Sequence, residues 1–190
     1  MGQAERCFDH SHTRAALVIA ILTGLTVAIA SAATAGEAAS RRTEEPWSAF
    51  LVAVSDALAA KNISVAHRAW RDAYGAALGS RTWLGMAEVG DAALRIGDVA
   101  RVRQPYEAKA RGSYLTALFR ARSAGSLDGV LRIAHAFEAL GDREVVEQCI
   151  RIAEHVATRA RDVEGRVRVK AFAARFSERP VVTNPVWTAP

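Results

Sequence analysis

Apolar residues recur at intervals of three and four along most of the chain between residues 47 and 178. This spacing places them on one face of an α-helix, which is the face that a folded protein buries. Trp47, Phe50, Leu51, Val54 and Leu58 form the first such stripe. Alanine is abundant, and runs of Val, Ile or Thr are rare outside the N-terminus, so the pattern predicts an all-α fold.

The stripes and their interruptions predict seven helices. Pro46 suits the first turn of the first helix, because its fixed φ fits there and its missing N–H is not needed. Pro105 predicts a kink or a fresh helix start near Gln104, since an interior proline removes a backbone hydrogen bond. The predicted helices run over about residues 46–58, 63–78 (stopped by Gly79), 82–96 (capped by Thr82), 99–122, 127–137, 145–156 and 162–177.

Three of the interruptions have related flanks and predict a repeated helix–turn–helix. They are Lys61-Asn62-Ile63, Ile96-Gly97-Asp98-Val99 and Leu140-Gly141-Asp142-Arg143. Aligning them on Asn62, Asp98 and Asp142 brings apolar positions into register before and after each turn. The intervals between the turns are unequal, and we attribute the longer second one to Pro105. These turns are interpreted as scaffold, so a working surface is expected on the helices that precede them.

From Trp47 to Arg159 the units resemble tetratricopeptide repeats, which pair two helices per repeat. The third unit carries the resemblance best, with Ala134 at the close crossing, Phe137 at the aromatic position, Gly141-Asp142 at the turn and Ala153 late in the second helix. The second unit departs from the pattern at Lys109, where a small residue is expected. The resemblance implies a right-handed superhelical array of antiparallel helix pairs, with about three repeats and the last helix as a cap.

Such repeats bind a protein or peptide in a groove lined by the first helix of each pair, and the resemblance implies the same here. Asp91, Asp128 and Glu138 against Arg95 would make this groove mildly acidic and part apolar. The Lys- and Asn-rich clamp that some family members use for a terminal carboxylate is missing at these positions. The groove positions are Ser55, Leu58, Asp91, Leu94, Arg95, Asp128, Leu131, His135 and Glu138.

Residues 1–35 predict an export signal. An uncharged apolar run spans residues 15–30 after Arg6 and Arg14, and Ala33-Thr34-Ala35 matches a small-residue cleavage pattern. The alternative is an uncleaved anchor that keeps this run in the inner membrane, with the rest of the chain facing the periplasm. We therefore expect an exported protein, periplasmic or secreted, with a linker at 36–46, the helical domain at 47–178 and a flexible tail at 179–190.

The net charge of +5 and pI near 9.8 permit an acidic partner, but the basic residues are interleaved with Asp and Glu. We interpret them as solvated helix faces and expect no nucleic-acid binding. The helix at 162–177 is the most basic element, with Arg166, Arg168, Lys170 and Arg175 on one side. Capping of the last repeat is its first interpretation. Contact with anionic lipid is the alternative, and it would make the chain a membrane-surface protein.

The sequence predicts no enzyme, cofactor or metal. It contains no G-x-S-x-G, no G-x-x-x-x-G-K-[ST] and no H-E-x-x-H motif. Cys7, Asp9, His10 and His12 are donor types for a metal, but they form one short cluster within the leader. Cys149 is expected to be a buried thiol, with an intermolecular disulfide as the alternative.

Overall fold

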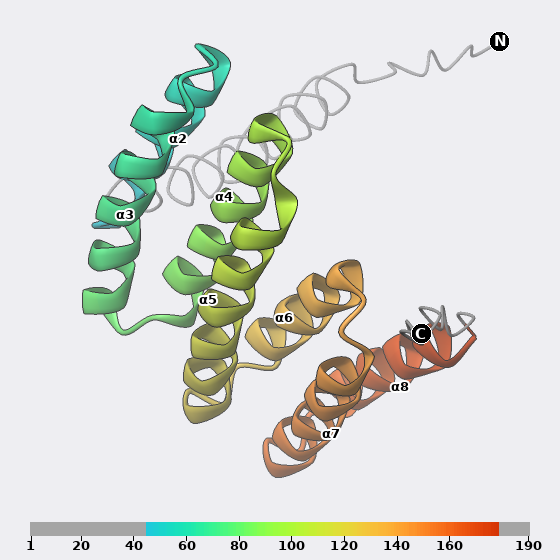
Figure 1. The fold of residues 1–190 in the computed structure, drawn as a ribbon. Helices are drawn as coiled ribbons and strands as arrows, with labels where there is room; N and C mark the ends of the chain where they lie inside the picture. Colours follow the sequence, from blue (N-terminus) through green and yellow to red (C-terminus); the bar gives the residue numbers. More distant parts are fainter. Residues whose placement is uncertain (1–44, 179–190) are drawn as a thin grey trace, which may run out of the picture. The chain divides into compact units, whose positions relative to one another are not determined.

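The computed structural model describes residues 45–178, and this part of the chain is all-helical, with seven helices and no strand (Figure 1). The predictions for the leader, most of the linker and the tail lie outside the described residues. No described helix is both long and apolar enough to span a membrane. The helices are α2 (Ser48–Ala59), α3 (Ile63–Ser80), α4 (Trp83–Ala100), α5 (Arg103–Ser123), α6 (Leu127–Leu140), α7 (Arg143–Arg159) and α8 (Val163–Ser177).

Consecutive helices pack against one another, and the short turns that connect them share one backbone conformation. In each turn the residue before the next N-cap adopts a left-handed conformation, with φ between 55° and 78°. At five of the six turns the N-cap N–H also bonds a carbonyl of the preceding helix's last turns, as Asn62 N–H does to Ala57 O at 2.8 Å. The left-handed residues are Lys61, Arg81, Arg101, Gly125, Gly141 and Arg161.

Two of the predicted helix ends are therefore misplaced, whereas Thr82 is the N-cap of α4, as predicted. Asp98 lies inside α4, which continues to Ala100, and the real break is at Arg101-Val102. Gly79 likewise lies inside α3, and Arg81 ends that helix. The alignment on Asp98 was wrong for this reason: the N-caps of α3, α5 and α7 are Asn62, Val102 and Asp142, which are evenly spaced along the chain.

The predicted fresh start at Pro105 is confirmed. Pro105 occupies the first turn of α5, where a backbone N–H has no partner within the helix, so the ring breaks no hydrogen bond. The prediction for Phe50 is wrong, because that side chain is 38% exposed and the stripe of α2 buries Trp47, Val54 and Ala57 instead. Pro46 also precedes the helix rather than opening it, and Trp47 is the N-cap.

α2, α4, α6 and α8 are called the first helices below, and α3, α5 and α7 the second helices. The third residue of α4, of α6 and of α8 is a glycine. A large side chain from the start of the preceding first helix packs against that glycine. Trp47 covers Gly85, Trp83 covers Gly129 and Leu127 covers Gly165. A Cβ on Gly129 would come within 2.9 Å of the Trp83 ring, so the close approach requires glycine. The same contact thus joins every successive pair of first helices.

Two arginines on α5 bind neighbouring turns. Arg111 donates through Nε to Asp142 Oδ2 at 2.7 Å, which links α5 to the turn before α7. This bond, more than any other cause, raises the pKa of Arg111. Arg120 donates to the carbonyls of Ala77, Leu78 and Thr82 at 2.8–3.0 Å, so its guanidinium satisfies the end of α3 and the turn before α4.

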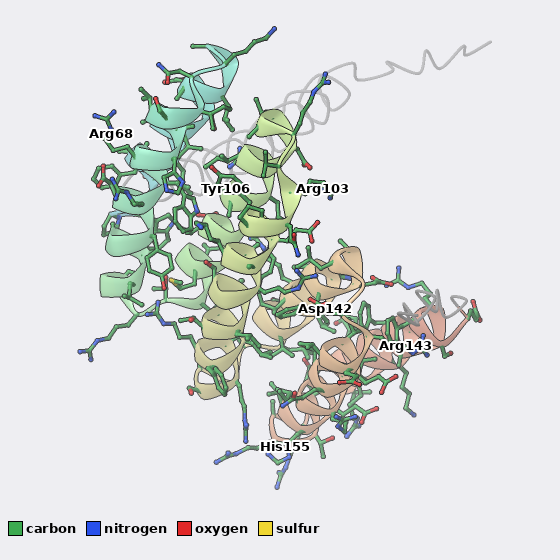
Figure 2. All side chains as sticks on the ribbon, viewed as in Figure 1. Arg68, Arg103, Tyr106, Asp142, Arg143 and His155 are labelled. Carbon is green, nitrogen blue, oxygen red and sulfur yellow. The ribbon has the colours of Figure 1, made fainter. Side chains whose placement is uncertain are left out.

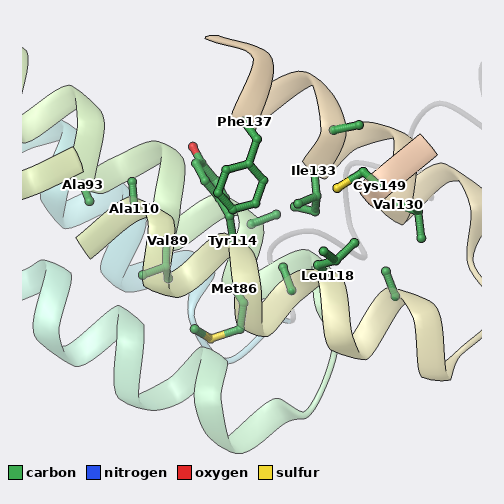
Figure 3. Packing of buried hydrophobic residues seen from close by; sticks show 14 of the residues in the cluster. Met86, Val89, Ala93, Ala110, Tyr114, Leu118, Val130, Ile133, Phe137 and Cys149 are labelled. Carbon is green, nitrogen blue, oxygen red and sulfur yellow. The ribbon is translucent and has the colours of Figure 1, made fainter. Parts of the chain in front are cut away.

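The centre of the core is a contact between α4, α5 and α6. The ring of Tyr114 lies directly on the Cα of Gly90 and meets Phe137 edge to face, with the ring centroids 5.8 Å apart (Figure 3). Its hydroxyl reaches the edge of the core and donates to Asp91 Oδ1 at 2.7 Å. Ser113 is the single buried polar residue among those described, and it returns its hydroxyl to Lys109 O on its own helix.

Candidate functional site

Polar side chains join each first helix to the next and form one continuous surface, which we call the first-helix face. Arg95 of α4 donates to Ser55 Oγ of α2 at 3.4 Å. Arg132 of α6 donates to Asp91 Oδ2 of α4 at 2.9 Å. Arg168 of α8 donates to Asp128 Oδ1 of α6 at 2.6 Å. These contacts are regular because residues about one helix pair apart occupy matching positions on successive first helices.

Asp91 connects this surface to the core. One carboxylate oxygen accepts from Tyr114 and the other from Arg132, so the side chain is held from both sides. Burial, and then the bond to Asp91, raise the pKa of Tyr114 well above its ordinary value. The phenol therefore stays protonated at physiological pH and remains a donor. This arrangement fixes Asp91 and Arg132 in place before any partner binds.

A hollow of about 400 Å³ opens on the first-helix face between α6 and α8. Leu131, Ala171 and Phe172 supply its apolar part, and Arg175 lies over the Phe172 ring at 5.9 Å. His135 stands edge to face on the same ring, with centroids 4.6 Å apart. The remaining lining residues are Asp128, Arg132 and Arg168. Such a mixture of apolar floor and charged rim suits a short polypeptide segment better than a small apolar ligand.

The structure places the predicted groove residues as follows. Ser55, Asp91, Arg95 and Asp128 take part in the contacts between first helices, and Leu131 and His135 line the hollow. His135 and Glu138 form a local pair, with Nδ1 and Oε2 3.3 Å apart. Leu58 and Leu94 are half-buried and pack against the core, which leaves them little area for a partner.

The expectation of a mildly acidic groove is wrong. It counted Arg95 as the single basic residue and missed Arg132, Arg168 and Arg175, which reach the same surface. Asp91 and Asp128 are each bound to an arginine, so the uncompensated charge of the hollow is the positive charge of Arg175. A signal was present in the sequence, because Arg168 stands one helix pair beyond Asp128. The misplaced turn at Asp98 concealed this spacing.

The basic residues of α8 divide between two roles. Arg168 binds Asp128 and Arg175 packs on Phe172, so both belong to the first-helix face. Arg166 and Lys170 are exposed, together with Val163 and Val167. Val169, Phe172 and Phe176 form the buried side of this helix.

Two further side chains are of interest for chemistry, a buried cysteine and a half-buried histidine. Cys149 is fully buried, as predicted, and burial raises the pKa of its thiol to about 12, which makes it a poor nucleophile. His67 packs on Trp70 and Tyr106, and its Nδ1 is buried without a hydrogen-bond partner among the described residues. No group of three or more His, Cys, Asp or Glu side chains within residues 45–178 has the geometry to hold a metal ion.

No protein-family model, curated protein or solved structure matches this chain.

Proposed function

We propose that this protein is a non-enzymatic interaction module that binds a peptide or protein segment on its first-helix face. The observation that carries the proposal is the hollow between α6 and α8, where an apolar floor lies beside charges that are already held in place. A partner would cover the exposed Ala171 and His135 above the buried Leu131 and Phe172, and it would bring an acidic group to Arg175. Preorganised charges lower the cost of ordering an interface on binding.

The architecture we propose for this module is a tetratricopeptide-like array, wound as a right-handed superhelix, with α8 as its cap. Support comes from the evenly spaced N-caps, the glycine contacts and the polar contacts, each of which recurs from one helix pair to the next. In such arrays the first helices line one side, so a surface that runs across α2, α4, α6 and α8 is continuous. With the leader predicted at residues 1–35, we propose that this module acts in the bacterial envelope as an assembly factor.

Quantitative co-purification of the full chain from envelope extract tests the proposal. The variant His135→Ala/Arg175→Ala removes two groups of the hollow. The matched control, Arg71→Ala/Phe119→Ala, removes two exposed side chains of the second helices. We expect the first variant to lose at least one protein that the wild type and the control both retain. Recovery of the same proteins by all three would contradict the proposal.

The second candidate is a membrane-surface function, favoured by the exposed Val163 and Val167 beside Arg166 and Lys170 on α8. Flotation of the mature chain, without residues 1–35, with vesicles that contain anionic lipid tests it. If Arg166→Gln/Lys170→Gln abolishes flotation and leaves the co-purified proteins unchanged, the lipid function is the correct one. Without flotation of the wild-type mature chain, the lipid function is rejected.

A further inference from the structure

A second group of basic residues lies on the second helices, on side chains that the proposed partner site does not use. Arg122 near the end of α5 and His155 and Arg159 near the end of α7 surround a hollow of about 410 Å³. An adjoining hollow of about 300 Å³ shares Arg122 and His155 and adds Arg151. Figure 2 shows His155 at the edge of the molecule, among nitrogen-tipped side chains.

The arginines here have no acidic partner, unlike Arg132 and Arg168 of the first-helix face, which bind Asp91 and Asp128. Arg95, Arg132 and Arg168 each donate to an oxygen of a neighbouring first helix. Arg122, Arg151 and Arg159 have no ion pair within residues 45–178, and no Asp or Glu lines either hollow. Two guanidinium groups line each hollow, Arg122 with Arg159 in the larger and Arg122 with Arg151 in the smaller, and a bound anion would offset their like charge.

The backbone around this hollow leaves room for a ligand. Gly125 follows the C-cap of α5 with φ +64°, and a Cβ built on it would meet nothing within 4 Å. Ser123 adds a hydroxyl to the lining beside Gly125. Guanidinium groups, an imidazole and a hydroxyl all donate hydrogen bonds to phosphate oxygens in proteins. An arginine suits this role best, because its guanidinium can bind two phosphate oxygens at once.

We propose that the hollow between the ends of α5 and α7 is an anion site for a phosphate-bearing group, held by Arg122, Arg159 and His155, with Arg151 at its rim. The site lies on the second helices and is separate from the first-helix face. The chemistry is shared by a free phosphate compound and by a phospholipid headgroup, and the experiment below distinguishes these two sources.

Titration calorimetry of the full chain with inorganic pyrophosphate tests the site. Arg122→Gln/Arg159→Gln removes two of its charges. Arg68→Gln/Arg71→Gln removes the same charge from exposed positions on α3, so the two variants have equal net charge. We expect the first variant to weaken pyrophosphate binding at least tenfold and the second to change it less than twofold. Thermal melts confirm that both variants fold.

A parallel measurement identifies the source of the phosphate. Vesicles that contain phosphatidic acid are floated with the wild-type chain and with both variants. If only pyrophosphate binding depends on Arg122 and Arg159, the ligand is a free phosphate compound. If vesicle binding also depends on these two arginines, the ligand is a lipid headgroup. Equal affinities of the two variants for both ligands, or no binding of either ligand by the wild type, would overturn the proposal.

Discussion

Gly90 and Gly112 allow the packing of the core to be tested with one substitution made twice. Both glycines lie inside helices, and replacing either with alanine removes the same backbone entropy cost, about 1 kcal/mol. A Cβ on Gly112 would meet nothing within 4 Å. A Cβ on Gly90 would stand 2.7 Å from Cδ1 and 2.9 Å from Cζ of the Tyr114 ring, which is closer than such atoms can approach.

The ring cannot easily move away from Gly90. Its hydroxyl is bound to Asp91 at 2.7 Å and its edge faces Phe137. Overpacking of this kind costs about 1–3 kcal/mol, and a weakened buried hydrogen bond adds about 1 kcal/mol. After subtraction of the helix-propensity gain, we expect Gly90→Ala to lower the free energy of unfolding by about 2 kcal/mol. Gly112→Ala should raise it by up to about 1 kcal/mol.

Chemical denaturation monitored by circular dichroism measures both values, and a thermal melt gives an independent check. About 2 kcal/mol corresponds to a fall in Tm of roughly 6–10 °C for a domain of this size. In the background of Tyr114→Leu the smaller side chain should remove most of the penalty of Gly90→Ala, which a double-mutant cycle would report as coupling. A Gly90→Ala variant as stable as the wild type would refute the packing of α5 on α4 described above.

Three further predictions concern single side chains. Arg120→Ala should lower the free energy of unfolding by about 2 kcal/mol, because three carbonyls lose a charged donor. Arg122→Ala should change the free energy of unfolding by less than about 0.5 kcal/mol, and urea denaturation measures both values. Burial, and then the nearby cations, lower the pKa of His67, so His67 takes up a proton more readily in the unfolded chain than in the folded one. The Tm should therefore fall as the pH drops below about 6.5, and His67→Gln should remove that part of the pH dependence. Arg101→Gly should raise the free energy of unfolding by about 0.5–1 kcal/mol, because glycine adopts φ of +56° without the strain of a side chain. The denaturation midpoint should rise accordingly, and a midpoint below that of the wild type would contradict this prediction.

The helices could be predicted from the sequence because their buried faces are wide and their apolar spacing is regular. Ser126 and Asp162 cap their helices with side-chain bonds to Gly129 N–H and Gly165 N–H, which is the kind of local signal that a sequence contains. The turns at Arg81 and Arg101 could not be predicted. A residue in the left-handed conformation is expected to be glycine or asparagine. In the sequence, an arginine that adopts this conformation cannot be distinguished from an arginine inside a helix.

The candidate site was predicted in part, and one error explains much of what was missed. With the turn placed at Val102, Ser55, Arg95 and His135 become equivalent positions on successive first helices, seven residues before each N-cap. Placed at Asp98, the turn paired Ser55 with Asp91 instead. The contacts of Arg132 and Arg168 depend on distances between helices, so apolar periodicity within one helix could not reveal them.

The first-helix face is tested most directly by site-specific photo-cross-linking in living cells. A photoreactive amino acid is placed in turn at Ser55, Arg95 and His135, which are exposed and equivalent, and at Phe119 of α5, which is 65% exposed. We predict that at least His135 and Arg95 yield the same cross-linked partner and that Phe119 does not. Cross-linking of that partner from Phe119 alone, or of no protein from any first-helix position, would contradict the account.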